Sequence, residues 1–191
     1  MKIMLRSLIA LVCLSVLVAC SPPPFKSTDI TGADFLLPLK LTDHNGKLRT
    51  MSYFKGKVVM LFFGYTHCPD VCPTTMSDLK KTMQLLGDKA NEVQVLFVTL
   101  DPARDTPEVL AQFVPSFDKR FIGLRGSLQE TAETMANFKI FYAKVEGTTK
   151  GDYTIDHSSG MYAFDKEGKI RLYIAYATKP ADMASDIEKL L

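Results

Sequence analysis

Two predominantly apolar runs constrain the fold of this chain more than any other feature. Residues 57–63 and 93–100 are rich in Val, Leu and Phe, and each run has the length of one strand. Such runs are typical of strands that are buried on both faces of a parallel sheet. Between them, the apolar side chains at positions 76, 79, 83 and 86 share one face of a helix. The pattern predicts strand, helix and strand as one unit, with helices covering the sheet.

Turn and capping signals on both sides of this unit predict the remaining elements. In chain order they are an N-terminal hairpin turning at 44–47, a helix over 106–117, a short strand near 121–124, a helix from 127, a late hairpin of 160–164 and 170–176, and a helix from 180. This order predicts an α/β fold with a central mixed sheet, in which parallel strands are followed by an antiparallel pair. One domain of ordinary size accommodates the chain.

The first twenty residues have the pattern of a processed leader. Lys2 and Arg6 precede an apolar run over 8–19, which is shorter than the roughly 20 residues that a membrane-spanning helix needs. Residues 17–20, LVAC, match a bacterial lipobox, in which Cys20 carries the lipid and becomes the new N-terminus. The predicted division is a signal peptide over 1–19, a lipidated, flexible tether over 20–31 and one domain over 32–191.

Cleavage of this leader changes both the charge and the cysteine count. The leader contains two of the 23 basic residues and no acidic ones, so 21 Lys and Arg remain against 21 Asp and Glu. Without a basic surplus, nucleic-acid binding is not expected. We expect an exported lipoprotein whose domain lies in the bacterial periplasm or on the outer face of the cytoplasmic membrane. Of the four cysteines, that domain keeps Cys68 and Cys72 as its only potential pair.

These two cysteines lie in residues 64–73, which read GYTHCPDVCP. They are expected where a buried strand ends and a helix begins, which is where ligands gather in open α/β sheets. If the helix begins near Cys68, residues four apart point the same way, and the helix N-terminus lowers the pKa of both thiols. The pair is therefore a candidate redox disulfide or a soft-metal site suited to Cu(I). A structural disulfide would close a very small loop and contribute little.

A third ligand is sought among three histidines. His67 adjoins Cys68 and is expected to point to the surface, and His44 lies in a turn and is expected to be solvated. His157 precedes the late hairpin, beside Asp156, whose carboxylate is placed to orient its ring. From these residues alone, a structural role for His157 remains the commoner alternative.

Other residues of the same segments are given simpler roles. Asp101 and Asp105 are expected to shape a loop and cap a helix, with Asp101 a candidate for a supporting role near the site. Tyr65 and Phe63 are expected to serve packing. Met76 and Met83 lie at helical spacing and are expected in the core rather than in a methionine metal site.

Three blocks of this sequence resemble the Sco/SenC family of copper-binding assembly factors of cytochrome c oxidase. They are GYTHCPDVCP with the following TTM, LDPARDTP over 100–107 and YTIDHS over 153–158, and the similarity runs from about residue 31 to the C-terminus. The resemblance implies a thioredoxin-like fold. It also implies that Cys68, Cys72 and His157 bind copper, as Cu(I) and Cu(II).

The same resemblance implies a binding protein rather than an enzyme. Its implied role is to deliver copper to the CuA centre of cytochrome c oxidase subunit II, or to help that centre mature, with another periplasmic copper chaperone as a further partner. An alternative that the resemblance permits is a thiol–disulfide reductase that keeps the CuA cysteines of the partner reduced. Cys68 would then attack and Cys72 would resolve, through a redox-active Cys68–Cys72 disulfide. The spacing of three residues and the presence of His157 favour copper binding as the main role.

Overall fold

The computed structural model describes residues 24–33, 39–149 and 151–191. Within these ranges, no helix combines the length and the apolar character needed to cross a membrane. The predicted signal peptide, the lipobox and Cys20 lie outside the described residues.

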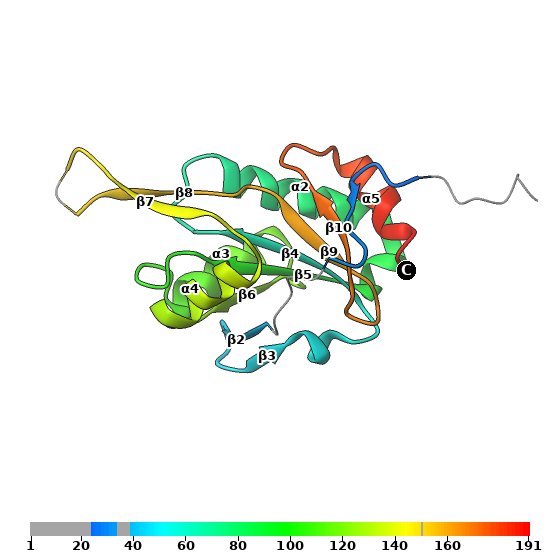
Figure 1. Cartoon of the computed structure of the whole chain (residues 1–191), viewed down its shortest axis with the longest axis horizontal. Coiled ribbons are helices and arrows are strands. Elements are labelled where there is room, and N and C mark those ends of the chain that lie inside the picture. Colours follow the sequence, from blue (N-terminus) through cyan, green and yellow to red (C-terminus); the bar gives the residue numbers. More distant parts are fainter. Residues whose placement is uncertain (1–23, 34–38, 150) are drawn as a thin grey trace, which may run out of the picture.

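A mixed sheet of eight strands forms the centre of the domain, in the order β1-β10-β9-β4-β5-β6-β2-β3. Its strands are β1 (Thr28–Asp29), β2 (Lys40–Asp43), β3 (Leu48–Thr50), β4 (Val58–Gly64), β5 (Val93–Thr99), β6 (Ile122–Arg125), β9 (Met161–Phe164) and β10 (Ile170–Ile174). The helices are η2 (Met51–Phe54), α2 (Val71–Leu86), η3 (Gly87–Glu92), α3 (Pro107–Phe117), α4 (Leu128–Asn137) and α5 (Pro180–Glu188). Figure 1 shows the sheet between helices, the thioredoxin-like arrangement that the resemblance implies.

The two apolar runs are the central parallel strands, as predicted. β4 pairs with β5 in parallel from Val58 opposite Val93 to Gly64 opposite Thr99, and all seven residues of each strand are buried. Side chains alternate between the two faces of the sheet. On one face the ring of Phe97 contacts that of Phe113 of α3, and on the other the ring of Phe63 lies 5.4 Å from that of Phe138. Helical layers therefore cover both faces.

Most of the predicted helix starts are confirmed. The Thr106 side chain accepts a hydrogen bond from the Val109 N–H at the start of α3, and Ser127 and Glu130 form a reciprocal capping box at the start of α4. The N-terminal hairpin (β2–β3) and the late hairpin (β9–β10) are present as antiparallel pairs. The helix that follows the cysteine loop begins at Val71, slightly earlier than the apolar spacing indicated.

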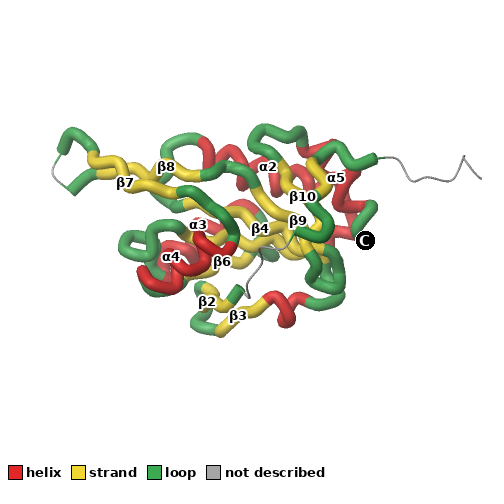
Figure 2. Tube along the Cα trace, in the orientation of Figure 1, coloured by secondary structure: helices red, strands yellow, loops and turns green. Residues whose placement is uncertain are grey.

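A further hairpin, β7 (Tyr142–Glu146) with β8 (Tyr153–His157), was not predicted. It forms a separate two-stranded sheet and extends from the body of the domain, as the strand colouring in Figure 2 shows. Ile155 is its only fully buried residue, so the sequence has no strong apolar alternation there. The Asp156–His157 segment ends this unpredicted strand, and residues 158–160 then lead directly into the late hairpin, as predicted.

The described part of the expected tether, residues 24–31, is not a free linker. The backbone N–H groups of Lys26 and Ser27 donate to the buried Asp186 carboxylate of α5 at 2.8 and 2.7 Å, and β1 adds to the edge of the sheet beside β10. The segment is therefore part of the fold, because these hydrogen bonds and the strand pairing hold it against α5 and β10.

We expect the Asp186 carboxylate to make the stability of the domain depend on acid pH. Burial would raise the pKa of Asp186, but the hydrogen bonds from the Lys26 and Ser27 N–H groups, together with those from the Ser27 and Lys189 side chains, leave the pKa lowered. A lowered folded-state pKa contributes stability above the usual value of 3.8, and this contribution is lost as the pH falls through the folded value. Asp186→Ala, which leaves these donors unpaired, should cost about 1–3 kcal/mol at neutral pH.

Urea unfolding between pH 2.5 and 6 measures this effect. The acid-dependent loss of stability should be smaller in Asp186→Asn than in wild type, whereas Asp88→Asn, at an exposed carboxylate, should keep the wild-type profile. Equal profiles for Asp186→Asn and wild type would contradict this role of Asp186.

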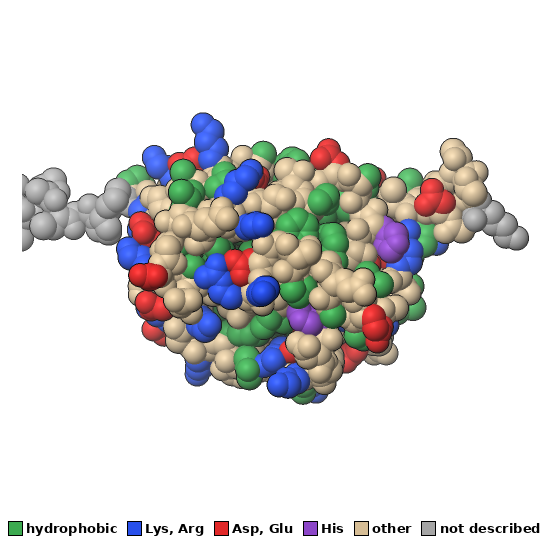
Figure 3. Space-filling view, turned by 180° about the vertical axis from the view of Figure 1, so that it is seen from behind, with side chains coloured by type: hydrophobic (Ala, Val, Ile, Leu, Met, Phe, Trp, Pro, Cys, Tyr) green, Lys and Arg blue, Asp and Glu red, His purple; other side chains and the backbone are tan. Residues whose placement is uncertain are grey.

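Charged side chains do not gather into a one-signed patch on the face shown in Figure 3. Lys and Arg side chains are interspersed there with Asp and Glu. This distribution agrees with the even charge balance of the domain.

Candidate metal centre

The cysteine loop connects the carboxyl end of β4 to α2. The Cys68 N–H donates to the Tyr65 carbonyl at 3.3 Å, and α2 begins only at Val71. Cys68 therefore precedes the helix and Cys72 lies in its first turn, so the condition under which both sulfurs would share one helical face is not met. The two residues are nevertheless joined, because the Cys72 N–H donates to Cys68 Sγ at 3.4 Å. Both are free thiols.

The Cys72 side chain is fully buried against the end of β4. A Cβ atom built on Gly64 would lie 2.9 Å from Cys72 Sγ, so only glycine leaves room for the sulfur at this position. Burial raises the pKa of the Cys72 thiol. The expectation that the helix N-terminus lowers the pKa of both thiols is thus wrong for Cys72, because desolvation of the thiolate is the larger effect. Cys68 is half-buried.

His157 ends β8 with its ring directed at Cys72. His157 Nε2 lies 3.7 Å from Cys72 Sγ, and Nδ1 lies 2.9 Å from the Ser158 carbonyl oxygen. Since a carbonyl only accepts, Nδ1 carries the proton and Nε2 presents its lone pair to the sulfur. Burial lowers the pKa of His157, which favours the neutral imidazole that binds metals. The ring partner is thus a backbone carbonyl, and the exposed Asp156 carboxylate does not orient it as expected.

An open cleft of about 450 Å³ gives solvent access to Cys68 and His157, while Cys72 is buried and does not line it. It is lined by Tyr65, Cys68, Pro69, Asp70, Val71, Thr154, Ile155, Asp156, His157 and Ser159. Among the described residues, no set of three or more His, Cys, Asp and Glu side chains is already arranged around one metal position. The structure brings His157 and Cys72 together, with Cys68 at the edge of the same cleft.

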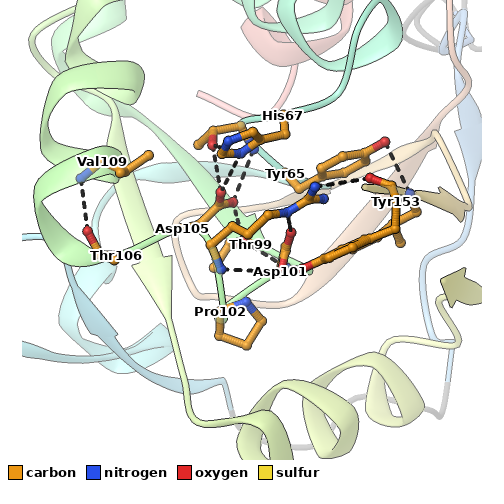
Figure 4. Close-up of polar contacts among 12 residues, drawn as sticks. Tyr65, His67, Thr99, Asp101, Pro102, Asp105, Thr106, Val109 and Tyr153 are labelled. Carbon is orange, nitrogen blue, oxygen red and sulfur yellow. Dashed lines mark hydrogen bonds and ion pairs between the residues drawn. The ribbon is translucent and has the colours of Figure 1, made fainter. Parts of the chain in front are cut away.

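Asp105 anchors the cysteine loop through hydrogen bonds. Its buried carboxylate accepts from the Thr66 hydroxyl at 2.6 Å, the Thr66 N–H at 3.1 Å and the Thr99 hydroxyl at 2.5 Å. These bonds tie the loop to the end of β5, as Figure 4 shows. His67 lies over them, with half of its side chain exposed, in agreement with the expected surface position.

Two residues have contacts that the sequence did not indicate. The Tyr65 hydroxyl accepts from the Ile155 N–H at 3.2 Å, and the Tyr65 ring meets that of His157 edge to face, so Tyr65 supports β8 as well as packing. A buried tyrosine needs a partner for its hydroxyl, which was the available signal. His44 is half-buried rather than solvated, since its Nδ1 accepts from the Gly123 N–H at 3.0 Å. It lines a different hollow, with Asp43 and Arg125.

Comparison with known proteins identifies relatives that match most of this chain. The sequence model of the family described as SCO1/SenC matches residues 27–191. A SCO2-like protein of Rickettsia conorii is 35% identical over 153 residues, covering 80% of this chain and 73% of that protein. The chain spans 50% of the yeast mitochondrial protein SCO2, at 36% identity.

Solved structures agree in fold. Bradyrhizobium japonicum ScoI, solved with copper bound, is 36% identical with a TM-score of 0.76, covering 83% of this chain and all of that one. The apo Sco1 protein of Thermus thermophilus is 36% identical with a TM-score of 0.77, covering 88% of this chain and 98% of that one.

Proposed function

The chain belongs to the SCO1/SenC family, and from this premise we propose that it is a copper-binding assembly factor that supplies copper to the CuA centre of cytochrome c oxidase subunit II. The observation that carries the proposal is the approach of His157 Nε2 to Cys72 Sγ, 3.7 Å apart on segments 85 positions distant in the sequence. A relative of 36% identity has been solved with copper bound.

The residues present fit a copper ion. Thiolates are soft ligands that favour Cu(I), and imidazole suits copper in either common oxidation state. The ion, which is the cargo of the protein, would be held by Cys68, Cys72 and His157. For this, the half-buried Cys68 side chain would turn toward the other two. Burial raises the pKa of Cys72, and metal binding would work against this effect, since a coordinating thiol releases its proton to solvent and binds as the thiolate.

Transfer would proceed by ligand exchange. Thiolates of the partner replace Cys68 and Cys72 one at a time, so that the ion stays bound throughout. The open cleft gives an incoming ligand a route to the site. Another periplasmic copper chaperone would load the protein.

We further propose the cellular address that the leader indicates. Residues 1–19 are removed as a signal peptide, Cys20 is lipidated, and the domain is held at the membrane on its exported side. Because residues 26 and 27 already dock on α5, only a short link separates the lipid from the folded domain.

A second candidate function is thiol–disulfide exchange, favoured by the unequal exposure of the two thiols. Cys68, half-exposed, would attack a disulfide of the partner and form a mixed disulfide. The buried Cys72 would then attack Cys68 Sγ and displace the partner's sulfur from the mixed disulfide, leaving a Cys68–Cys72 disulfide and a reduced partner. Two electrons pass to the partner, and an external reductant of the thiol class restores the pair.

His157→Ala separates the two functions. Under the copper proposal, this substitution removes a direct ligand. Loss of a residue that only supports a ligand lowers metal affinity by up to about 100-fold, so Cu(II) affinity should fall here by at least that much. Thiolate-to-Cu(II) absorption should also be lost. Dithiol exchange with a model disulfide should be nearly unchanged, since the exchange steps use only the two sulfurs.

The measurement is a copper titration of the reduced domain beside a dithiol-exchange assay on the same samples. His67→Ala is the matched control, because this exposed imidazole lies beside Cys68 without facing Cys72. Unchanged copper binding in His157→Ala would rule out the three-ligand site.

A further inference from the structure

The middle of the three sequence blocks, residues 100–107, supplies none of the proposed ligands, yet it contacts both segments that carry them. One contact runs through Asp105 to Thr66 in the cysteine loop. The other runs through Asp101 and Arg104 to Tyr153 in β8, the strand that ends at His157. One short loop therefore joins two parts of the site that are far apart in the sequence.

The contact with β8 is a closed set of charged and polar interactions. Arg104 Nε donates to the Asp101 carboxylate, and Arg104 Nη1 donates to the Tyr153 carbonyl at 3.0 Å. The Tyr153 hydroxyl completes the set by donating to Asp101 at 2.9 Å (Figure 4). The guanidinium also lies 3.5 Å from the centre of the Tyr153 ring, in cation–π contact. Asp101, Arg104 and Tyr153 thus fix both the backbone and the side chain at the start of β8.

Such support matters because few contacts besides those of Tyr65 hold β8 to the body of the domain. It belongs to the separate two-stranded sheet, and Ile155 is its only fully buried residue. Local stability increases with the number of buried apolar contacts, so a hairpin with few of them opens more readily than a core strand. Arg104 Nη2 is moreover buried with no partner among the described residues, a cost that packing alone does not explain.

We propose that Arg104, held by Asp101, is a positioning residue that sets the distance between His157 and Cys72. The proposal rests on the proposed function for its copper readout, but the placement of β8 is measured separately. Arg104 touches neither ligand. It acts through Tyr153, four residues before His157, while Asp105 holds the cysteine loop in the same frame.

The test compares Arg104→Met, Arg104→Lys and Tyr153→Phe in the reduced domain. Arg104→Met keeps much of the side-chain volume but removes all three interactions, and should lower copper affinity by about 10–100-fold, as loss of ligand-supporting residues does. It should also shift the thiolate-to-Cu(II) absorption band. Arg104→Lys keeps the charge beside Asp101 but lacks the fork that also reaches the Tyr153 carbonyl, so it should lie between Arg104→Met and wild type. Tyr153→Phe loses only the hydroxyl bond and should have the smallest effect.

Arg120→Met is the matched control, since Arg120 makes an equivalent pair with Asp118 at the exposed end of α3. Amide hydrogen exchange over residues 153–157 of the copper-free domain should quicken in Arg104→Met and not in Arg120→Met. Faster exchange with unchanged copper affinity and spectrum would overturn the positioning role, and unchanged exchange would overturn the contact itself. If wild type binds no copper, the proposed function fails, while the exchange comparison still decides whether Arg104 holds β8.

Discussion

Cys68→Ser and Cys72→Ser are each expected to abolish tight copper binding by the reduced domain, the largest functional effect expected of any single substitution here. A serine hydroxyl is a hard, neutral donor that Cu(I) does not favour, whereas the thiolate is soft and charged. Cys68 is only half-buried at the edge of the core, so Cys68→Ser should stay close to wild type in stability. Cys72 is fully buried, so Cys72→Ser should also destabilise the fold by leaving a hydroxyl in an apolar site.

Anaerobic titration with Cu(I) against a competing chelator measures these affinities, and urea unfolding of the copper-free proteins separates lost ligation from lost folding. Ser159→Ala, which changes a residue lining the cleft that is not a proposed ligand, should bind as wild type does. If reduced wild type binds copper no more tightly than the two serine variants, the copper proposal fails.

Gly64→Ala is expected to have the largest combined effect on stability and copper binding. The added methyl would lie 2.9 Å from Cys72 Sγ, 3.1 Å from the Phe97 ring and 3.2 Å from the Phe62 ring, all of them buried. None of these neighbours has free space to move into, so overpacking should cost about 1–3 kcal/mol. Displacing Cys72 Sγ should also move it from His157 and weaken copper binding.

A double-mutant cycle identifies the sulfur as the source of this effect. Combining Gly64→Ala with Cys72→Ala removes the nearest clashing atom, so the two changes should cost less together than the sum of their separate costs. The coupling, read from urea unfolding, should fall within about 0.5–3 kcal/mol, the range for residues in contact. Additive costs would show that the methyl group is accommodated elsewhere.

The core of the fold could be predicted because its signals are local and dense. The runs that became β4 and β5 consist mainly of Val, Leu and Phe, and the caps of α3 and α4 are set by Thr106, Ser127 and Glu130 within one turn of each helix. The β7–β8 hairpin could not be found this way, because strands with one fully buried residue leave no periodic apolar pattern. The docking of residues 24–31 was missed because its partner, Asp186, is about 160 positions away.

The candidate site shows the same difference between features that the sequence predicts and features that depend on distant contacts. Its three proposed ligands followed from motif resemblance, and the mutual approach of His157 and Cys72 agrees with that expectation. The supports did not follow. Asp156 was the nearest carboxylate in the sequence, yet the Ser158 carbonyl holds the ring, while Tyr65 and Arg104 reach β8 from other elements.

By itself, the sequence determined most of the residues that enter the core, where α3 and α4 begin and which donors are soft enough for copper, because each of these depends on a residue and its near neighbours. Only the tertiary structure decided the burial of Cys72, the environment that raises its pKa, and the loop that joins the cysteine segment to β8. Those properties arise from groups brought together across the chain, where desolvation and hydrogen bonding depend on distance in space rather than on position in the sequence.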